Sequence, residues 1–207
     1  IKRTFEKKEK KLVTFTTGGD PDLETSFSIL KTIISNKIDI VEIGMPFSDP
    51  MADGPTIQES STRSIENGTI INDIFELVKK IRSLNNEIPV ILMGYYNSIF
   101  NIGIKKFTSK CVEVGVDGLI IVDLQPEEDD ELFLKTKENN IDLIRLITPT
   151  TDKERLKTIL NNASGFLYYV TITGITGQNS ANLKELESSI NLIRSESNLP
   201  IVAGFGI

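Results

Sequence analysis

The chain has 207 residues, of which 39% are hydrophobic and 25% are charged, so it can bury a core of its own and is not a disordered chain. Its 23 basic and 29 acidic residues give a net charge of −6, which argues against a nucleic-acid surface or a polybasic membrane contact. The sequence contains no histidine, which excludes Ser-His-Asp and Cys-His catalysis and His-ligated zinc. Chemistry in this chain must therefore use carboxylates, hydroxyls, lysine or backbone amides.

The single cysteine, Cys111, cannot form an intramolecular disulfide, which is typical of a reducing compartment. No apolar run approaches the roughly 18 residues that a membrane-spanning helix needs, and the charged N-terminal segment lacks a signal-peptide core. We therefore expect a soluble, cytoplasmic protein, or one of the plastid stroma if the chain is organellar.

Seven short runs rich in β-branched residues predict strands. They lie at residues 12–17, 38–43, 90–93, 119–122, 143–146, 166–170 and 201–203. Helices are predicted between them, and in the first helix Asp20 is suited to cap the N-terminus and Pro21 to the first helical position. Apolar stripes identify this helix and two later ones: Leu23, Phe27, Leu30 and Ile34; Ile74, Leu77, Val78 and Ile81; and Leu183, Leu186, Ile190 and Ile193.

Strict alternation of strands and helices predicts parallel strands, either in a doubly wound sheet or in a (β/α)8 barrel. Seven strands, with no Gly-x-Gly-x-x-Gly turn after the first, favour the barrel. We therefore expect an α/β fold, a (β/α)8 TIM barrel lacking its eighth βα unit, in a single domain over residues 1–207. Because the chain begins at Ile1 without an initiator methionine and stops at Ile207 directly after the seventh strand, we expect it to be cut at both ends.

Glu42 is the first candidate catalytic residue, because the working residues of such barrels lie at the C-terminal ends of strands. Side chains alternate along the second strand, so Glu42 shares a face with Ile38 and Ile40. If that face lines the barrel interior, apolar neighbours desolvate the carboxyl and raise its pKa into the range of a general acid and base. The alternative is a solvated glutamate with an ionic partner, and spacing alone leaves both open.

The loop after this strand, residues 44–55, contains three prolines and two acids. Because proline restricts the backbone, Asp53 can be held at a fixed distance from Glu42. Taken alone, however, Asp53-Gly54 is more often an ordinary turn, and the same alternative applies to Asp49.

Backbone amides are the candidates for phosphate binding, because the chain has no P-loop. Two glycine clusters follow predicted strands, at residues 173–177 and 204–206, where barrels often bind phosphate. Other side chains near strand ends carry less specific expectations: Asp123 for contact with substrate or partner, Tyr95 and Tyr96 after the third strand, Tyr168 and Tyr169 for barrel packing, and Arg145 for pairing with an internal acid. Cys111 is expected to be a small core residue without chemistry.

The segment at residues 41–58 reads VEIGMPFSDPMADGPTIQ and closely resembles the signature of the tryptophan synthase alpha subunit family. The likeness continues in order at residues 15–21, 92–97, 118–124, 165–170, 174–177 and 204–207. It implies a (β/α)8 barrel without cofactor or metal, a lyase that cleaves indole-3-glycerol phosphate by a retro-aldol reaction to indole and glyceraldehyde 3-phosphate. It also implies an α2β2 heterotetramer, in which indole passes to a pyridoxal-phosphate beta subunit for L-tryptophan biosynthesis.

The resemblance also assigns roles to individual residues. Glu42 matches the proton donor and acceptor, and Asp53 matches the aspartate that accepts a hydrogen bond from the indole N–H. The remaining matches are the substrate-binding residues Phe15, Tyr95, Ile120, Tyr168 and Thr176, the phosphate-binding amides of Gly177 and Gly206, and Asp49 with Pro46 at the face toward the beta subunit. Among these, Thr176 is expected to close toward Asp53 and exclude water.

Two residues depart from the family pattern. Gln125 stands where proline is usual, and Ile172 stands where some members have a basic residue.

Two other functions stay open. A stand-alone lyase that releases free indole would use the same residues for its chemistry. A non-catalytic module that only activates a beta subunit is disfavoured, because binding alone requires neither Glu42 nor Asp53. A different phosphate-handling barrel is disfavoured because its chemistry normally needs a lysine at a strand end.

Overall fold

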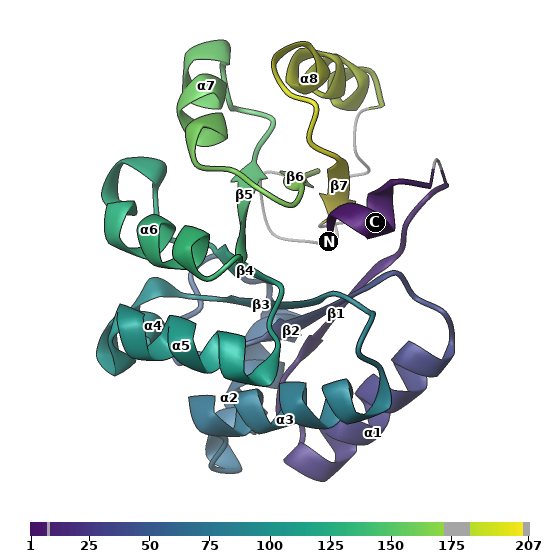
Figure 1. The fold of residues 1–207 in the computed structure, drawn as a ribbon, viewed down its shortest axis with the longest axis vertical. Helices are drawn as coiled ribbons and strands as arrows, with labels where there is room; N and C mark the ends of the chain where they lie inside the picture. Colours follow the sequence, from purple (N-terminus) through teal and green to yellow (C-terminus); the bar gives the residue numbers. More distant parts are fainter. Residues whose placement is uncertain (8, 172–182, 205–207) are drawn as a thin grey trace.

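A computed structural model describes residues 1–7, 9–171 and 183–204, and for residues 183–185 it describes the backbone alone. Within these residues the strands form one parallel sheet in the order β1-β2-β3-β4-β5-β6-β7, and the sheet curls into a partial barrel (Figure 1). The strands are β1 (Val13–Thr17), β2 (Ile40–Gly44), β3 (Val90–Gly94), β4 (Gly118–Ile121), β5 (Asp142–Ile147), β6 (Leu167–Val170) and β7 (Ile201–Gly204). All seven predicted strands are confirmed, and their ends differ from the prediction by at most two residues.

Except for η1, which precedes β1, the helices connect successive strands, and those longer than one turn cover the outside of the curled sheet (Figure 1). They are η1 (Lys2–Phe5), α1 (Leu23–Ser35), α2 (Pro55–Glu66), α3 (Ile71–Leu84), α4 (Tyr96–Ile102), α5 (Ile104–Val114), η2 (Pro126–Glu128), α6 (Asp130–Glu138), α7 (Lys153–Asn161) and α8 (Leu183–Glu196). In the part of the chain described, no helix is both long and apolar enough to cross a membrane.

The start of α1 differs from the prediction. Asp22, not Asp20, is the N-cap, and its carboxylate accepts hydrogen bonds from the Thr25 amide and hydroxyl at 2.8 Å each. The Asp20 carboxylate instead accepts two hydrogen bonds from the Arg63 guanidinium in α2, at 2.8 and 2.9 Å. The assignment of Pro21 to the first helical position was therefore also wrong, because the helix begins at Leu23.

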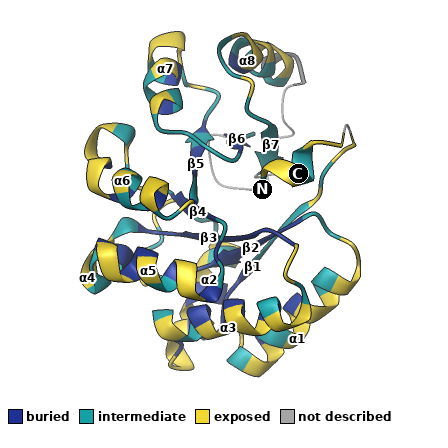
Figure 2. Ribbon diagram, viewed as in Figure 1, coloured by how far each residue is buried: buried dark blue, intermediate teal, exposed yellow. Residues whose placement is uncertain are grey.

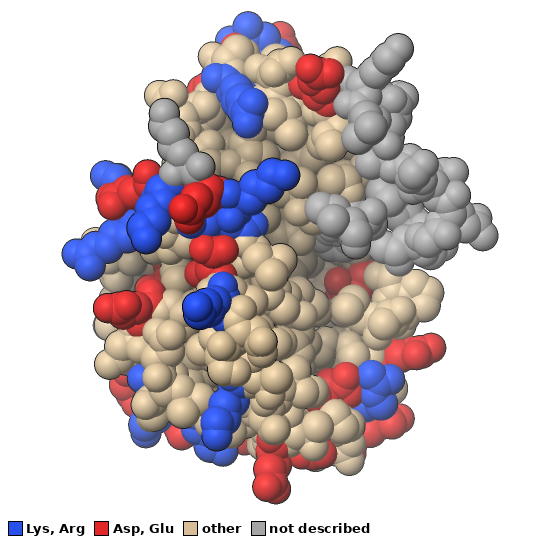
Figure 3. Space-filling model, turned by 90° about the vertical axis from the view of Figure 1, so that its right-hand side faces the viewer, with Lys and Arg blue, Asp and Glu red and all other residues tan. Residues whose placement is uncertain are grey.

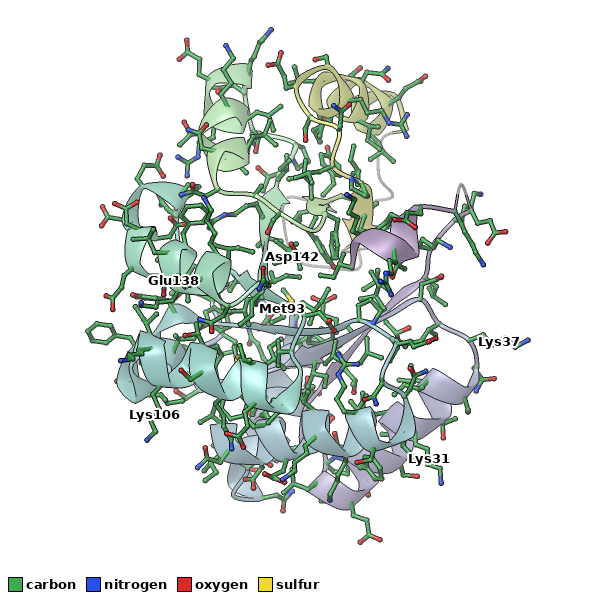
Figure 4. All side chains as sticks on the ribbon, in the orientation of Figure 1. Lys31, Lys37, Met93, Lys106, Glu138 and Asp142 are labelled. Atoms are coloured by element: carbon green, nitrogen blue, oxygen red, sulfur yellow. The ribbon has the colours of Figure 1, made fainter. Side chains whose placement is uncertain are left out.

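Apolar side chains on the two faces of the sheet build two layers of core. The outward side chains of β2 to β5 pack with α1, α3 and α5, as the dark inner faces of these helices in Figure 2 indicate. The inward side chains form a separate cluster inside the curl: Ile40, Ile91, Met93, Ile120, Ile144, Phe166 and Tyr168. Figure 4 places Met93 within this interior, whereas Lys31 and Lys106 point away from the molecule. Burial on both faces explains why the strands read as continuous apolar runs.

The N-terminal segment packs against the inner cluster. Ile1 and Phe5 are partly buried there, and the Phe5 and Phe166 ring centroids lie 5.8 Å apart with a tilt of 56°. Figure 1 shows η1 beside β7. Since Phe166 immediately precedes β6, this contact covers the interior at the N-terminal ends of the strands, opposite the end where barrel enzymes place their chemistry.

The exposed surface carries charges of both signs. Figure 3 shows acidic and basic side chains interspersed on one face, as expected from a net charge of only −6. Three of the ion pairs among the described residues join neighbours on one helix: Glu76 with Lys79, Lys110 with Glu113, and Lys135 with Glu138. Pairs of this exposed kind contribute little to stability.

A different ion pair is buried between β5 and the start of α6. Arg145 contacts Asp129, and these residues are 5% and 1% exposed. Asn162 donates a further hydrogen bond to the Asp129 carboxylate at 3.1 Å. The expected pairing of Arg145 with an internal acid is therefore confirmed.

We predict that Asp129→Ala lowers the free energy of unfolding by about 3–5 kcal/mol, because it leaves the Arg145 guanidinium buried without a counter-charge. Replacing both residues together, Asp129→Leu with Arg145→Met, should recover much of this loss. Urea denaturation measures both effects. Glu127→Ala is the control, because it breaks a neighbouring but exposed pair with Arg155 and should cost far less. Equal losses for Asp129→Ala and Glu127→Ala would contradict the prediction.

Candidate active site

Glu42 lies on the inner face of β2, in the middle of the strand rather than at its C-terminal end. It is opposite Phe15 of β1 and Ile91 of β3 in the strand register, and it is 1% exposed. Its Oε1 atom is buried and makes no hydrogen bond within the described part of the chain. Burial raises the pKa of the Glu42 carboxyl from 4.5 to about 8. Of the two alternatives that the sequence left open, the desolvated carboxyl is therefore the one observed.

The neighbours of Glu42 explain this shift. Ile40 shares its inward face, as the alternation along the strand predicted. Ile38, however, packs with the outer cluster, because the strand begins only at Ile40 and the alternation does not extend back to residue 38. Glu42 also raises the pKa of the Tyr168 hydroxyl, after the larger effect of burial, which indicates that these two side chains lie close together.

Asp53 lies in the loop after β2, where its carboxylate accepts a hydrogen bond from the Tyr95 hydroxyl at 3.0 Å. Burial raises the pKa of Asp53, and the bond from Tyr95 partly offsets this effect. The same Tyr95 oxygen accepts a hydrogen bond from the Ala52 amide at 3.0 Å, and the Phe47 ring stacks on Tyr95 at 5.0 Å and 23°. Asp53 is therefore held by contacts in addition to the prolines of its loop.

A narrow pocket lies beside Asp53 and Tyr95 at the C-terminal ends of β1 to β3. The residues lining it include Phe15, Thr17, Asp53, Ser61, Met93 and Tyr95. Gly44 allows the Phe15 ring to sit close to the backbone, since a Cβ atom at Gly44 would lie 2.7 Å from that ring. The pocket thus combines an apolar wall with one carboxylate and one phenol hydroxyl at fixed positions.

The structure brings together most of the predicted site residues that it describes. Ile120 and Tyr168 belong to the inner cluster, and Phe15 packs against it. Asp49 is exposed and Pro46 half-buried on the loop after β2, so both are available to a partner. Thr176, Gly177 and Gly206 lie outside the described residues, as does Ile172. The functional roles of all these residues stay predictions.

Asp123 has a local role that the sequence did not indicate. Its carboxylate accepts a hydrogen bond from the Tyr96 amide at 2.7 Å, at the first residue of α4, where the N-cap residue Tyr95 makes no side-chain cap. The adjacent Val122 amide donates to the Gly94 carbonyl at 3.0 Å. The end of β4 therefore holds the backbone on both sides of Tyr95. Gln125 follows on the same exposed loop.

Sequence reasoning missed two further side chains of this site, Met93 and Phe47. Met93 could have been found from the alternation along β3, which places it on the same face as Ile91. No pattern indicated the stacking of Phe47 on Tyr95, because those residues are brought together only by the fold. Within the described residues, no three aspartate, glutamate or cysteine side chains cluster in a way that could hold a metal ion.

The fold and this site define a class of protein. It is an α/β barrel with a buried carboxyl on β2 and a second, fixed carboxylate in the loop that follows, an arrangement suited to proton transfer. The family model of the tryptophan synthase alpha chain matches residues 1–207. The chain therefore belongs to the tryptophan synthase alpha chain family, and this membership makes it a lyase-type enzyme.

Solved structures agree with this assignment. The chain is 37% identical to tryptophan synthase subunit alpha from Legionella pneumophila, with a TM-score of 0.90, covering 100% of this chain and 78% of that one. It is 38% identical to the subunit from Campylobacter jejuni, with a TM-score of 0.85 and coverage of 97% and 80%. A structure from the tryptophan synthase α2β2 complex of Pyrococcus furiosus is 33% identical, with a TM-score of 0.87 and coverage of 95% and 79%. The predicted barrel fold is thus confirmed.

The raised pKa of Glu42 predicts a pH dependence of stability. The native protein keeps this proton up to about pH 8, whereas the unfolded chain releases it above about pH 4.5, so the native state loses stability as pH rises through this window. Glu42→Gln cannot titrate. Relative to that variant, the free energy of unfolding of the native protein should fall by up to about 5 kcal/mol between pH 4 and 9.

Urea denaturation of both proteins across this pH range measures the difference. Glu66→Gln makes the same chemical change on the exposed end of α2 and is the control for replacing a carboxyl that is not buried. A constant difference between the native protein and Glu42→Gln would mean that Glu42 is already ionised near pH 5.

Proposed function

We propose that this chain is the catalytic alpha subunit of a tryptophan synthase and cleaves indole-3-glycerol phosphate to indole and glyceraldehyde 3-phosphate. The observation that carries the proposal is the pair of carboxyl groups: Glu42, buried with a pKa of about 8, and Asp53, fixed by Tyr95 beside an apolar pocket. A group with a pKa near the working pH can both give and take a proton. The retro-aldol reaction requires both transfers.

In the proposed mechanism the protonated Glu42 carboxyl gives its proton to C3 of the indole ring. The glycerol hydroxyl next to the bond that breaks then loses its proton, and the carboxylate of Glu42 accepts it. The electron pair of the O–H bond forms the aldehyde carbonyl, while the electrons of the cleaved carbon–carbon bond return to the ring. Indole and glyceraldehyde 3-phosphate leave, and Glu42 is again protonated.

Asp53 supplies electrostatic stabilisation in this scheme. Protonation at C3 creates positive charge on the ring nitrogen, and a carboxylate that accepts its N–H hydrogen bond stabilises that charge. Two hydrogen bonds of the Tyr95 hydroxyl support this role, because Tyr95 donates to Asp53 and is itself fixed by Ala52. Burial and the nearby acids Asp53 and Asp123 raise the pKa of the Tyr95 hydroxyl, so it stays a donor.

Four side chains would contact the indole ring: Phe15, Ile120, Tyr168 and Met93. The last three belong to the inner cluster, and Phe15 packs against it. Phe15 and Met93 also line the pocket beside Asp53. The amides of Gly177 and Gly206 would bind the phosphate, and Thr176 would close over Asp53. Catalysis in this scheme uses neither a cofactor nor a metal ion. Membership of a family of biosynthetic enzymes supports a cytoplasmic location.

We further propose a tryptophan synthase beta subunit as partner. The loop after β2 supports this, because it presents the exposed side chains of Asp49 and Met51, the latter 80% exposed, from the same segment that holds Asp53. A partner that binds this loop could therefore change the position of Asp53. The similar chain from Pyrococcus furiosus belongs to a tryptophan synthase α2β2 complex that shows mutual activation.

The direct test is indole release from indole-3-glycerol phosphate, assayed with and without a tryptophan synthase beta subunit. Slow release that rises strongly with the partner is the expected result. Fast release without the partner would instead indicate a stand-alone lyase. No release under either condition would contradict the proposed activity and favour a module that only binds.

Glu42→Gln should reduce indole release by at least about 10³-fold, because the isosteric amide cannot transfer the proton. Substrate binding and beta-subunit association should remain close to native. The substrate dissociation constant, measured by calorimetry, and single-turnover indole release separate the two effects. Turnover within tenfold of native would exclude Glu42 as the proton donor.

Asp53→Asn should also be severely impaired, by about 10²-fold or more, because the amide cannot stabilise positive charge on the ring nitrogen. Asp49→Asn provides a matched control on the same loop: without the beta subunit it should release indole at the native rate, but it should respond less to added partner. The assay is again indole release. Full activity of Asp53→Asn would mean that another group holds the indole nitrogen.

A further inference from the structure

Helix α2 docks on the sheet by polar contacts. Its buried side chains are Ser60, Ser61 and Ser64. The neighbouring helix α3 instead buries apolar side chains: Ile74, Phe75, Leu77, Val78 and Ile81. Apolar packing is non-directional, whereas a hydrogen bond fixes distance and angle. The position of α2 should therefore depend on a few specific hydrogen bonds.

Two of these bonds are buried at the end of β1. The hydroxyls of Thr17 and Ser60 lie 2.6 Å apart, and the Ser64 hydroxyl donates to the Gly18 carbonyl at 2.7 Å. Ser60 and Ser64 are one helical turn apart, so they face the same stretch of chain. A buried hydrogen bond that loses one partner is costly, and this makes the contact specific.

The same row of contacts continues toward the surface. Beyond Gly18, the Asp20 carboxylate accepts two hydrogen bonds from Arg63, and the Pro21 carbonyl accepts one from the Asn67 amide at 2.6 Å. Residues 17–21 are therefore bound side by side to successive turns of α2. These contacts join segments about 43–46 residues apart in the chain.

The docked helix leads directly to the candidate active site. Helix α2 begins at Pro55, two residues after Asp53, and the Gln58 side chain donates to the Asp53 carbonyl at 2.8 Å. Thr17 also lines the pocket that contains Asp53 and Tyr95. A shift of α2 would thus move the Asp53 backbone, while Tyr95 would remain in place between β3 and α4.

We propose that Thr17 and Ser60 are positioning residues, whose buried hydrogen bond holds α2 where Asp53 meets both Tyr95 and the indole nitrogen of the substrate. This inference rests on the proposed role of Asp53 in catalysis. Neither hydroxyl takes part in proton transfer. Their effect on the reaction passes through the placement of the carboxylate, and displacements of about 1 Å in an active site can cost up to about 10²-fold in rate.

The test compares Thr17→Val and Ser60→Ala with the native protein, each assayed for indole release without a beta subunit. Each variant should lower kcat about tenfold, with KM changed less than about twofold. The double variant should lose no more than the worse single variant, because both changes remove the same bond. Thr17→Ser keeps the hydroxyl and should restore most of the activity.

Thr108→Val is the matched control. Thr108 is also fully buried, and its hydroxyl donates to the Ile104 carbonyl at 2.9 Å within α5, outside the lining of the Asp53 pocket. This variant should lower the melting temperature as Thr17→Val does, yet leave kcat unchanged. A fall in kcat for Thr108→Val equal to that for Thr17→Val would overturn the proposal, as would native kcat in both Thr17→Val and Ser60→Ala.

A second readout does not depend on turnover. The Tyr95 hydroxyl donates to Asp53, so the ¹³Cζ resonance of Tyr95, assigned with Tyr95→Phe, reports this contact. It should move in Thr17→Val and Ser60→Ala but not in Thr108→Val. An unmoved resonance in both site variants would overturn the inference. If the native protein releases no indole, the proposed function fails, but the Tyr95 resonance still tests whether the Thr17–Ser60 hydrogen bond positions Asp53. If Thr17→Val does not fold, Ser60→Ala alone is used for the test.

Discussion

The burial of one carboxyl group, that of Glu42, is the constraint on which the account of this protein depends. The inward face of the sheet is otherwise apolar around it, with Phe15 and Ile91 opposite Glu42 on the two neighbouring strands. A carboxylate in such surroundings is unstable, so the group keeps its proton to about pH 8. The Glu42 carboxyl is therefore still protonated at neutral pH, and its burial lowers the stability of the fold. This retained proton is the one that Glu42 gives to the substrate in the proposed mechanism.

The two carboxyl groups of the site are held in different ways. Glu42 lies within a central strand, paired on both sides, and its position follows from the register of the sheet. Asp53 lies in a loop and depends on polar contacts with Tyr95, Gln58 and, through α2, with the end of β1. The first arrangement suits a group that must stay desolvated. The second leaves Asp53 open to adjustment by whatever binds the exposed part of its loop.

The sequence was sufficient for the strands, because β-branched runs are a short-range pattern. Alternation along β2 placed Glu42 on one face with Ile40, but spacing alone left open whether the carboxyl was desolvated. The sequence was insufficient where residues distant in the chain decide the outcome. Asp20 was suited to cap α1, but Arg63 takes its carboxylate and Asp22 is the cap. The bond from Tyr95 to Asp53 spans 42 residues and that from Thr17 to Ser60 spans 43, so no local pattern indicates either. For Arg145 the chemistry predicted a buried acid, and only the fold identified Asp129.

The most direct test of this account is the titration of Glu42 itself in the native protein. The ¹³Cδ resonance of Glu42, assigned by its loss in Glu42→Gln, can be followed from pH 4 to pH 10. The account predicts a midpoint near pH 8, well above the value of 4.5 for a glutamate that is not buried in a protein. A midpoint near 4.5 would contradict it, because Glu42 would then be ionised at neutral pH and could not give a proton to the substrate.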